Sequence, residues 1–310
     1  MRRLHGQGVP AGDHGRGHRL HGGDRRRALA RGAGALSVAR AQQGVSRAQQ
    51  GVATARAKHV LVTGAGTGIG RAIALRLARD GYALSLAART KSKLDATARE
   101  IAKAGGAAPL VLALDIRERA AVDRAFARAA KVNGPLHALV ANAGIGGANA
   151  PGAKDRFAEL VATNLNGTYH CLRAAERHLA AGPDARHLVV NASVLARIGV
   201  AGYTGYCASK TGLLGLVRAL AMELAPQNVQ VNALCPGWVD TEMAREGLAG
   251  MAKALKTDVA GAKRIAMQAV PLGRMSQPED VAGLVAWLLS KDARGVTGQA
   301  IDMNGGAFMS

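Results

Sequence analysis

The sequence predicts an α/β fold: a single doubly wound, parallel, seven-stranded sheet with helices on both faces, preceded by a disordered extension. Three observations predict it. Short apolar strand patterns alternate with helical patterns from residue 59 to residue 310. A glycine-rich loop, residues 64–70, separates the first strand from the first helix. Hydrophobic residues make up 48% of the chain but aromatic residues only 3%, so the core is expected to be aliphatic side chains packed against glycine.

Residues 1–58 differ in composition from the rest and are predicted to be disordered. They hold 12 Lys and Arg against Asp13 and Asp24, a net charge of +10, and have no apolar periodicity. A nucleic-acid-binding arm, an organelle transit peptide and a non-functional extension are the readings open to this segment. Because it has no interleaved aromatic residues and no recognisable module, we expect no nucleic-acid partner. Residues 59–310 are the predicted folded domain.

The predicted folded domain is itself basic. Outside the extension, 29 of the 41 Lys and Arg and 19 of the 21 Asp and Glu remain, which leaves a net charge of +10. This charge favours anionic ligands such as dinucleotide phosphates, acyl-CoA or an acidic carrier protein. The cysteines, Cys171, Cys207 and Cys235, have no CxxC spacing, which fits a cytoplasmic protein and predicts neither disulfides nor a metal site. No apolar run suits a membrane span of roughly 18 residues, so no membrane partner is expected.

The apolar patterns give the elements in order. Strands are expected at residues 59–63, 82–88, 109–116, 137–141, 187–193, 229–234 and 298–306. Helices are expected at residues 71–81, 91–104, 117–130, 159–175, 206–225 and 278–290. Residues 242–270 are rich in Met, Ala and Gly with weak helical periodicity, which suits a mobile lid over a pocket.

The glycine loop indicates nucleotide binding. Gly64, Gly68 and Gly70 are spaced GxxxGxG between a buried strand and a helix. Glycines permit the tight turn and let backbone amides approach a pyrophosphate, and the helix N-terminus supplies a favourable positive potential. The strand–loop–helix context makes this interpretation specific, since glycine-rich turns alone are common.

The ends of the next strands suggest which dinucleotide binds. The second strand ends at Ala88 and Arg89, where an acid would favour NAD and an arginine favours the 2′-phosphate of NADP. Arg89 therefore indicates NADPH over NADH; the alternative is an ordinary solvated basic turn. Asp115, past the third strand, could accept from an adenine amino group or cap the next helix. Residues 142–144, Asn-Ala-Gly, place small groups where a cofactor ring must pass closely.

A serine, a tyrosine and a lysine follow the fifth strand. Tyr206 and Lys210 are four residues apart at the start of a long helix, so they lie about one turn apart on one face. An ammonium that close is expected to lower the tyrosine pKa from about 10 and so favour proton exchange with a carbonyl or alcohol oxygen. Ser193 could hold the same oxygen from the other side. Asn164, a poor helix former within an apolar helical pattern, is a further candidate.

Together these motifs resemble the short-chain dehydrogenase/reductase family. The matching residues are TGAGTGIG at 63–70, Asp115, NAG at 142–144, NLNG with Asn164, Ser193, YCASK at 206–210 and PGWVDT at 236–241. The resemblance covers residues 59–310, and the C-terminal half is most similar to 3-oxoacyl-[acyl-carrier-protein] reductases and aromatic-polyketide ketoreductases. Ala141 is one departure, because the family often has a second asparagine there that supports the sheet.

The resemblance implies a role for each motif. Tyr206 would be the general acid and base, Lys210 would lower its pKa and hold the nicotinamide ribose, and Ser193 would orient the substrate oxygen. Asn164 would support a water relay behind the lysine. Cofactor binding is implied for Gly64, Thr67, Gly68, Ile69, Gly70, Arg89, Asp115, Ile116, Asn142, Ala143, Gly144, Tyr206, Lys210, Pro236, Gly237, Val239 and Thr241. Substrate binding is implied for Ser193, Leu195, Tyr203, Tyr206 and Trp238.

The hypothesis that follows is an NADPH-dependent carbonyl reductase. Its substrate would be a small-molecule or carrier-bound ketone, of the 3-oxoacyl thioester or polyketide type, which is reduced to a secondary alcohol. The alternatives are a dehydrogenase that oxidises a hydroxyacyl-CoA or another secondary alcohol, and a non-catalytic dinucleotide-binding protein. The resemblance also implies a homotetramer with the helices around Asn164 and after Tyr206 at one interface.

Overall fold

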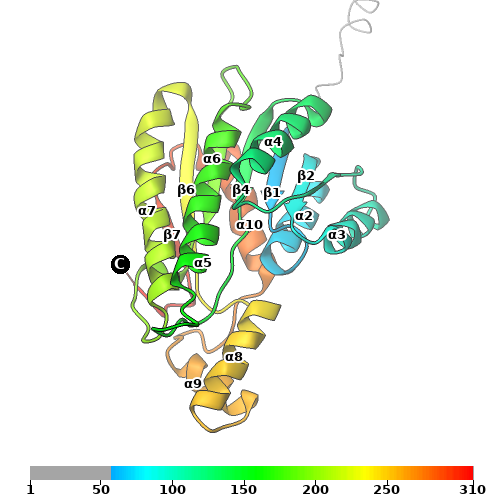
Figure 1. Ribbon diagram of the computed structural model, residues 1–310. Coiled ribbons are helices and arrows are strands. Elements are labelled where there is room, and N and C mark those ends of the chain that lie inside the picture. The colour runs from blue at the N-terminus through cyan, green and yellow to red at the C-terminus, as the bar shows by residue number, and fades with distance from the viewer. Residues whose placement is uncertain (1–56, 310) are drawn as a thin grey trace, which may run out of the picture. The chain divides into compact units, whose positions relative to one another are not determined.

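One parallel sheet organises the fold (Figure 1). The computed structural model describes residues 57–309, so all but the last two residues of the predicted extension lie outside it. The strand order is β3-β2-β1-β4-β5-β6-β7, and neighbouring strands are parallel throughout. The strands are β1 His59–Thr63, β2 Ala83–Ala88, β3 Leu110–Ala113, β4 Leu136–Ala141, β5 Arg186–Asn191, β6 Val229–Pro236 and β7 Ala300–Met303. The predicted seven-stranded, doubly wound sheet is confirmed.

Helices cover both faces of the sheet (Figure 1). The helices are α2 Gly68–Arg79, α3 Lys91–Lys103, α4 Arg119–Asn133, α5 Phe157–Val161, α6 Thr168–Glu176, α7 Thr204–Leu224, α8 Glu242–Ala254, α9 Val259–Gln268 and α10 Pro278–Leu288. One buried cluster joins α4, α6 and α7 to the sheet, and another joins α2, α3 and α10 to its other face. Alternate residues of β1 belong to the two clusters, Leu61 to the first and Val60 and Val62 to the second. This is the pattern of a strand buried on both faces.

The helix expected at residues 159–175 is interrupted. The structure has α5, then a π-helical turn at Ala162–Gly167, then α6. The turn contains Asn164, whose buried side chain bonds to backbone atoms outside the helix. A π-turn of this kind is frequent at functional sites, and no helical periodicity in the sequence marks it.

The segment expected to be a weakly helical lid folds into two capped helices. Thr241 accepts a hydrogen bond from the Ala244 amide at the start of α8, and Asp258 accepts one from the Gly261 amide at the start of α9. The two helices share a small core with Met275 and the Trp238 ring. Local caps and this core account for regular helices where the apolar periodicity is weak.

Candidate active site

The strand order places a topological switch point at the carboxyl ends of β1 and β4. These strands are neighbours, and the chain winds outward from them in opposite directions, to β2 and β3 on one side and to β5, β6 and β7 on the other. Open α/β sheets bind ligands at such a switch point. The glycine loop follows β1, Asn142 to Gly144 follow β4, and Ser193 follows β5. The predicted cofactor and catalytic motifs therefore meet at one edge of the sheet.

The glycines of the loop are required by its geometry. Gly64 and Gly68 have φ values of +68° and +50°, in the left-handed region that favours glycine. A Cβ on Gly70 would lie 2.2 Å from the Gly64 carbonyl oxygen and 2.5 Å from Nδ2 of Asn142. The loop thus turns back on the start of α2 without room for a side chain, which fits a cradle for a pyrophosphate.

Hydrogen bonds fix the loop against the end of β4. The Thr63 hydroxyl oxygen accepts from the amides of Asn142 and Ala143 at 3.0 and 3.1 Å, and Asn142 Nδ2 donates to the Thr63 carbonyl at 3.1 Å. Asn191 at the end of β5 donates to Asn142 Oδ1 at 2.9 Å. Ala141, which stands where the family often has a second asparagine, is 3% exposed within the core. The Asn142–Asn191 bond joins β4 and β5 at the next residue along the chain.

Arg89 and Asp115 lie close together at the ends of β2 and β3. Arg89 is exposed, and its charge contributes to lowering the Asp115 pKa. The principal cause of the lowered Asp115 pKa is Arg117, whose Nη2 donates to Oδ2 at 2.7 Å. The alternative of Asp115 as a helix cap is wrong, because Glu118 stands at the N-cap of α4 and Asp115 is held by Arg117. Arg117 was not among the predicted site residues.

Asn164 connects the loop after β4 to the helix that carries Tyr206. Its side chain is fully buried; Oδ1 accepts from the Ile145 amide at 2.9 Å, and Nδ2 donates to the Ile145 carbonyl and to the Ser209 hydroxyl. A Cβ on Gly144 would lie 3.1 Å from Asn164 Oδ1 and 3.5 Å from Lys210 Nζ. Gly144 therefore leaves room for both the asparagine and the lysine side chains.

Ser193, Tyr206 and Lys210 come together as the spacing predicts. Ser193 is 8% exposed, and its hydroxyl lies close enough to the Tyr206 phenol to lower the pKa of that phenol. Lys210 Nζ lies 5.8 Å from the centre of the Tyr206 ring and donates to the Asn191 carbonyl at 2.8 Å. All three groups lie at the carboxyl edge of the sheet, where a carbonyl oxygen can contact serine and tyrosine together.

The expected lowering of the Tyr206 pKa is wrong for the site as it stands. Burial raises the pKa of Tyr206, and only the hydrogen bond from Ser193 lowers it, while Lys210 is not among its causes. Burial also lowers the pKa of Lys210 to about 8. The physical reason is that a buried site disfavours both charged forms, and the ammonium is directed to the Asn191 carbonyl.

The segment after β6 adds the predicted residues 236–241. The Gly237 amide donates to the Met303 carbonyl, and a Cβ on Gly237 would lie 2.9 Å from Asn304 Cα. Thr241 approaches the glycine loop, since a Cβ on Gly68 would lie 3.1 Å from its Cγ2. Trp238 packs against α8, 3.6 Å from where a Gly247 Cβ would stand, and joins the small core shared by α8 and α9.

The remaining predicted residues line the same edge with different exposure. Thr67 is exposed, whereas Ile69 is half-buried and Ile116 is 6% exposed against the π-turn. Leu195 and Tyr203, predicted to bind substrate, are half-buried beside Ser193 and Tyr206. Pro236, the last residue of β6, and Val239, in the segment after it, are buried.

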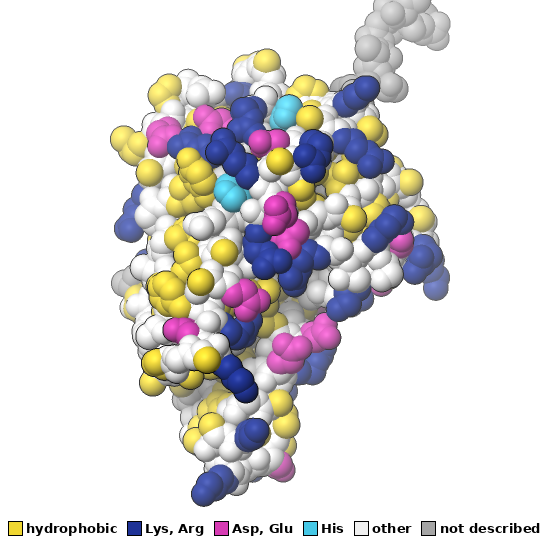
Figure 2. Space-filling view, in the orientation of Figure 1, with side chains coloured by type: hydrophobic (Ala, Val, Ile, Leu, Met, Phe, Trp, Pro, Cys, Tyr) yellow, Lys and Arg dark blue, Asp and Glu magenta, His cyan; other side chains and the backbone are white. Residues whose placement is uncertain are grey.

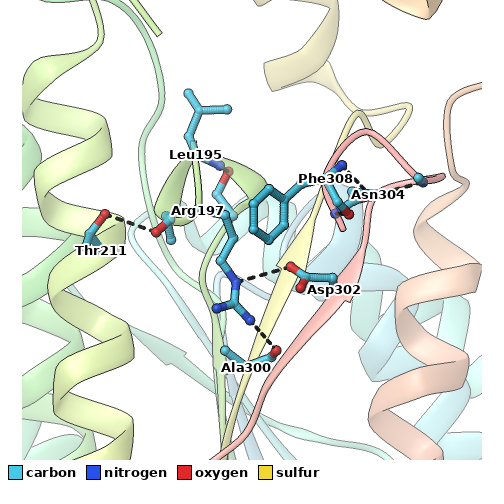
Figure 3. A network of polar contacts seen from close by, with 10 residues as sticks. Leu195, Arg197, Thr211, Ala300, Asp302, Asn304 and Phe308 are labelled. Atoms are coloured by element: carbon cyan, nitrogen blue, oxygen red, sulfur yellow. Dashed lines mark hydrogen bonds and ion pairs between the residues drawn. The ribbon is translucent and has the colours of Figure 1, made fainter. Parts of the chain in front are cut away.

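Two further polar side chains near the site, besides Arg117, could not be predicted from the sequence. Asn149 is buried; its Oδ1 accepts from the Gly205 amide at 2.8 Å, and its Nδ2 donates to Asp155 and Thr204. It caps α7 one residue before Tyr206, although it lies 56 residues away in the sequence. Arg197 bonds to β7, as Figure 3 shows. Neither position has a local sequence signal, because both partners are distant along the chain.

Among residues 57–309 there is no cluster of three or more His, Cys, Asp or Glu that could hold a metal ion. Within the same described range, no helix has the length and apolar character needed to cross a membrane.

Comparison with known proteins agrees with this site. A family model described as enoyl-(acyl carrier protein) reductase matches residues 64–307. A Streptomyces virginiae protein named as the ketoacyl reductase of the monensin polyketide synthase is 38% identical over 79% of this chain and 95% of its own length. The 3-oxoacyl-[acyl-carrier-protein] reductase of Pseudomonas aeruginosa is 36% identical over 82% of this chain and 98% of its own.

A solved structure shows the same fold. A crystal structure of an actinorhodin polyketide ketoreductase variant with NADPH superposes with a TM-score of 0.76 and 33% identity, covering 81% of this chain and 97% of the other. The fold and the site thus define an α/β oxidoreductase. The chain belongs to the short-chain dehydrogenase/reductase family, as its motifs indicate.

Proposed function

We propose that this chain is an NADPH-dependent ketoreductase that converts a 3-oxoacyl thioester or polyketide ketone to a secondary alcohol. The observation that carries the proposal is the convergence of Ser193, Tyr206 and buried Lys210 at the carboxyl edge of the sheet, with Lys210 Nζ 5.8 Å from the Tyr206 ring centre. The similarity to 3-oxoacyl-[acyl-carrier-protein] reductases and to a polyketide ketoreductase supports the substrate class.

The residues present fit a dinucleotide. Gly64, Gly68 and Gly70 form a turn that a Cβ would fill, and Gly144 leaves the space beside Lys210 open. Arg89, exposed at the end of β2, would pair with a 2′-phosphate, which supports NADPH over NADH. When bound, NADPH supplies the hydride that reduces the carbonyl carbon.

The chain's own residues would handle the carbonyl oxygen. Ser193 and Tyr206 donate hydrogen bonds to it, and Tyr206 transfers its proton as negative charge develops there. The phenolate that results is stabilised by the serine hydroxyl, and Lys210 lies beside it with its Nζ 5.8 Å from the ring centre. Asn164 keeps the loop after β4 and the α7 helix in register through its bonds to Ile145 and Ser209.

Loss of NADPH absorbance tests the proposal, with acetoacetyl-CoA and a bicyclic ketone as substrates and NADH as the comparison. Turnover with NADPH is expected, and Tyr206→Phe should lower kcat by about a hundredfold or more, since it removes the proton donor. Tyr82→Phe is the matched control, because Tyr82 bonds only weakly to the Leu289 carbonyl, at 3.4 Å, far along the chain. Full activity in Tyr206→Phe would contradict the proposed ketoreductase function.

The alternative of a dehydrogenase uses the same residues in reverse, with Tyr206 taking a proton from an alcohol. Turnover of a 3-hydroxyacyl-CoA with NADP and none of either ketone would favour it. A non-catalytic dinucleotide-binding protein would bind NADPH and turn over neither substrate in either direction.

We also propose that the chain assembles into a homotetramer through the face made by α5, α6 and α7. Phe157, Tyr169 and Met222 are 44%, 42% and 81% exposed there. Figure 2 shows hydrophobic side chains gathered over α6 and α7. Sedimentation velocity tests the assembly; a monomer at micromolar concentration contradicts it.

The unpaired cysteines Cys171, Cys207 and Cys235 suit a cytoplasmic protein.

A further inference from the structure

The turn that carries Ser193 is short and needs support from other elements. It is a 3₁₀ turn, Val194–Ala196, in which the Ser193 hydroxyl accepts from the Leu195 amide at 3.1 Å. A short 3₁₀ segment has few internal hydrogen bonds with which to hold its geometry. On the side of α7, the Thr211 hydroxyl donates to the Ala196 carbonyl at 3.3 Å.

The other side of the turn is fastened by Arg197 (Figure 3). Its Nε donates to Asp302 at 3.3 Å, and its Nη2 donates to the Ala300 carbonyl at 2.6 Å. The side chains of Arg197 and Asp302 are 23% and 19% exposed, so this ion pair is screened less than the surface pairs of the molecule. Both partners lie on β7, which is separated from the turn by about a hundred residues.

The C-terminal segment joins the same contact. The Phe308 ring centre lies 5.8 Å from the Arg197 guanidinium carbon, a cation–π distance. Asn304 holds Phe308 in place, since its Oδ1 accepts from the Phe308 amide and its Nδ2 donates to the Phe308 carbonyl. In Figure 3, Leu195 and the Arg197 guanidinium point to opposite sides of the turn, so the arginine is an anchor and not a group facing substrate beside Leu195.

We propose that Arg197, Asp302 and Phe308 form a clasp that positions Ser193 and Leu195 for the carbonyl substrate. The effect of the clasp on catalysis rests on the proposed ketoreductase function, whereas its effect on the geometry of the serine turn does not. Arg197 is a positioning residue in this role. It fixes the serine turn against β7 while Thr211 fixes it against the helix of Tyr206 and Lys210.

A loosened turn changes the acidity of Tyr206 in a known direction. The groups that act on the Tyr206 pKa are the Ser193 hydroxyl, which lowers it, and Tyr203 and Cys207, which raise it together with burial. Lys210 lies beside the same ring. If Ser193 moves away, the Tyr206 pKa rises further. The phenolate that Tyr206 becomes when it gives its proton to the carbonyl oxygen is then harder to form.

The test compares Arg197→Leu and Asp302→Asn with the control Arg76→Leu. Arg76 forms an ion pair of similar length with Asp80, but within α2 and away from the turn. Hydrogen–deuterium exchange of the peptide spanning residues 193–199 is the readout that needs no substrate. We expect faster exchange in Arg197→Leu and Asp302→Asn and no change in Arg76→Leu, with the NADPH Kd unchanged in all three.

Activity is the second readout. In Arg197→Leu, kcat should fall by about tenfold to a hundredfold, as for an active-site displacement near 1 Å, and the pH profile of kcat should shift to higher pH. Arg197→Lys, which keeps the charge but not the planar fork, should recover only part of kcat. Unchanged exchange with unchanged kcat in Arg197→Leu overturns the clasp. A wild-type chain that reduces no ketone, while exchange still rises in the variant, refutes the proposed function and supports the clasp.

Discussion

Replacing Gly70 by alanine tests the nucleotide loop without touching a charged or catalytic group. Alanine at this helical position would gain up to about 1 kcal/mol over glycine from helix propensity alone. A Cβ there, however, would lie 2.2 Å from the Gly64 carbonyl oxygen, well inside the 3.4 Å at which ordinary contact begins. That atom belongs to the backbone, so no side chain can rotate away to make room.

The cost of overpacking, set against the gain in helix propensity, decides whether Gly70→Ala stabilises or destabilises the chain. A shift of the loop by about 1 Å costs roughly 1–3 kcal/mol as overpacking, which exceeds the gain in helix propensity. Taking the middle of that range, about 2 kcal/mol, less the gain of up to about 1 kcal/mol, we expect Gly70→Ala to lower the free energy of unfolding by about 1 kcal/mol or more. Because the displaced backbone amides would face the pyrophosphate in the proposed cofactor site, NADPH affinity should fall by about tenfold to a hundredfold.

Gly250→Ala is the matched control. Gly250 is exposed in α8, and a Cβ there meets nothing within 4 Å. This substitution should stabilise the chain by about 0.5–1 kcal/mol and leave NADPH binding unchanged. Urea unfolding and titration of NADPH fluorescence measure both variants. Wild-type NADPH affinity in Gly70→Ala, with equal stability gains in the two variants, would refute the steric argument.

Two further predictions concern buried polar side chains other than Asn164, Ser193, Tyr206 and Lys210. Asn149→Ala leaves the Gly205 amide without its acceptor, so it should cost about 1–3 kcal/mol of stability and lower kcat. Asn149→Asp keeps an acceptor and should retain more of both the stability and kcat. Equal thermal unfolding of wild type and Asn149→Ala contradicts this prediction. Burial lowers the pKa values of His137 and His187 to about 4 and about 3. Because the unfolded chain binds these protons first, stability should fall by about 2 kcal/mol per histidine as pH drops from about 7 to about 5, and His187→Gln should reduce this loss, as urea midpoints would show.

The sequence could predict the sheet because its central strands are buried on both faces. Runs such as His59–Thr63 and Val229–Pro236 are continuously buried, and they read as short apolar segments between turn signals. The glycine loop could be predicted because Gly64 and Gly70 are imposed by local backbone geometry. The π-turn at Asn164 could not, since it depends on bonds from Asn164 to Ile145 and Ser209.

The same distinction applies to Tyr206. The four-residue spacing correctly predicts that Lys210 lies beside it, because helical geometry is local. The direction of the Tyr206 pKa shift is not set by local sequence. It depends on burial by the surrounding chain and on the Asn191 carbonyl, which accepts the hydrogen bond that Lys210 donates. The Ser193 hydroxyl is the group that opposes burial, so its placement decides how readily the phenol ionises. The anchoring of the serine turn by Arg197 to a strand about a hundred residues away is therefore part of the acid–base chemistry of this site, and not only of its stability.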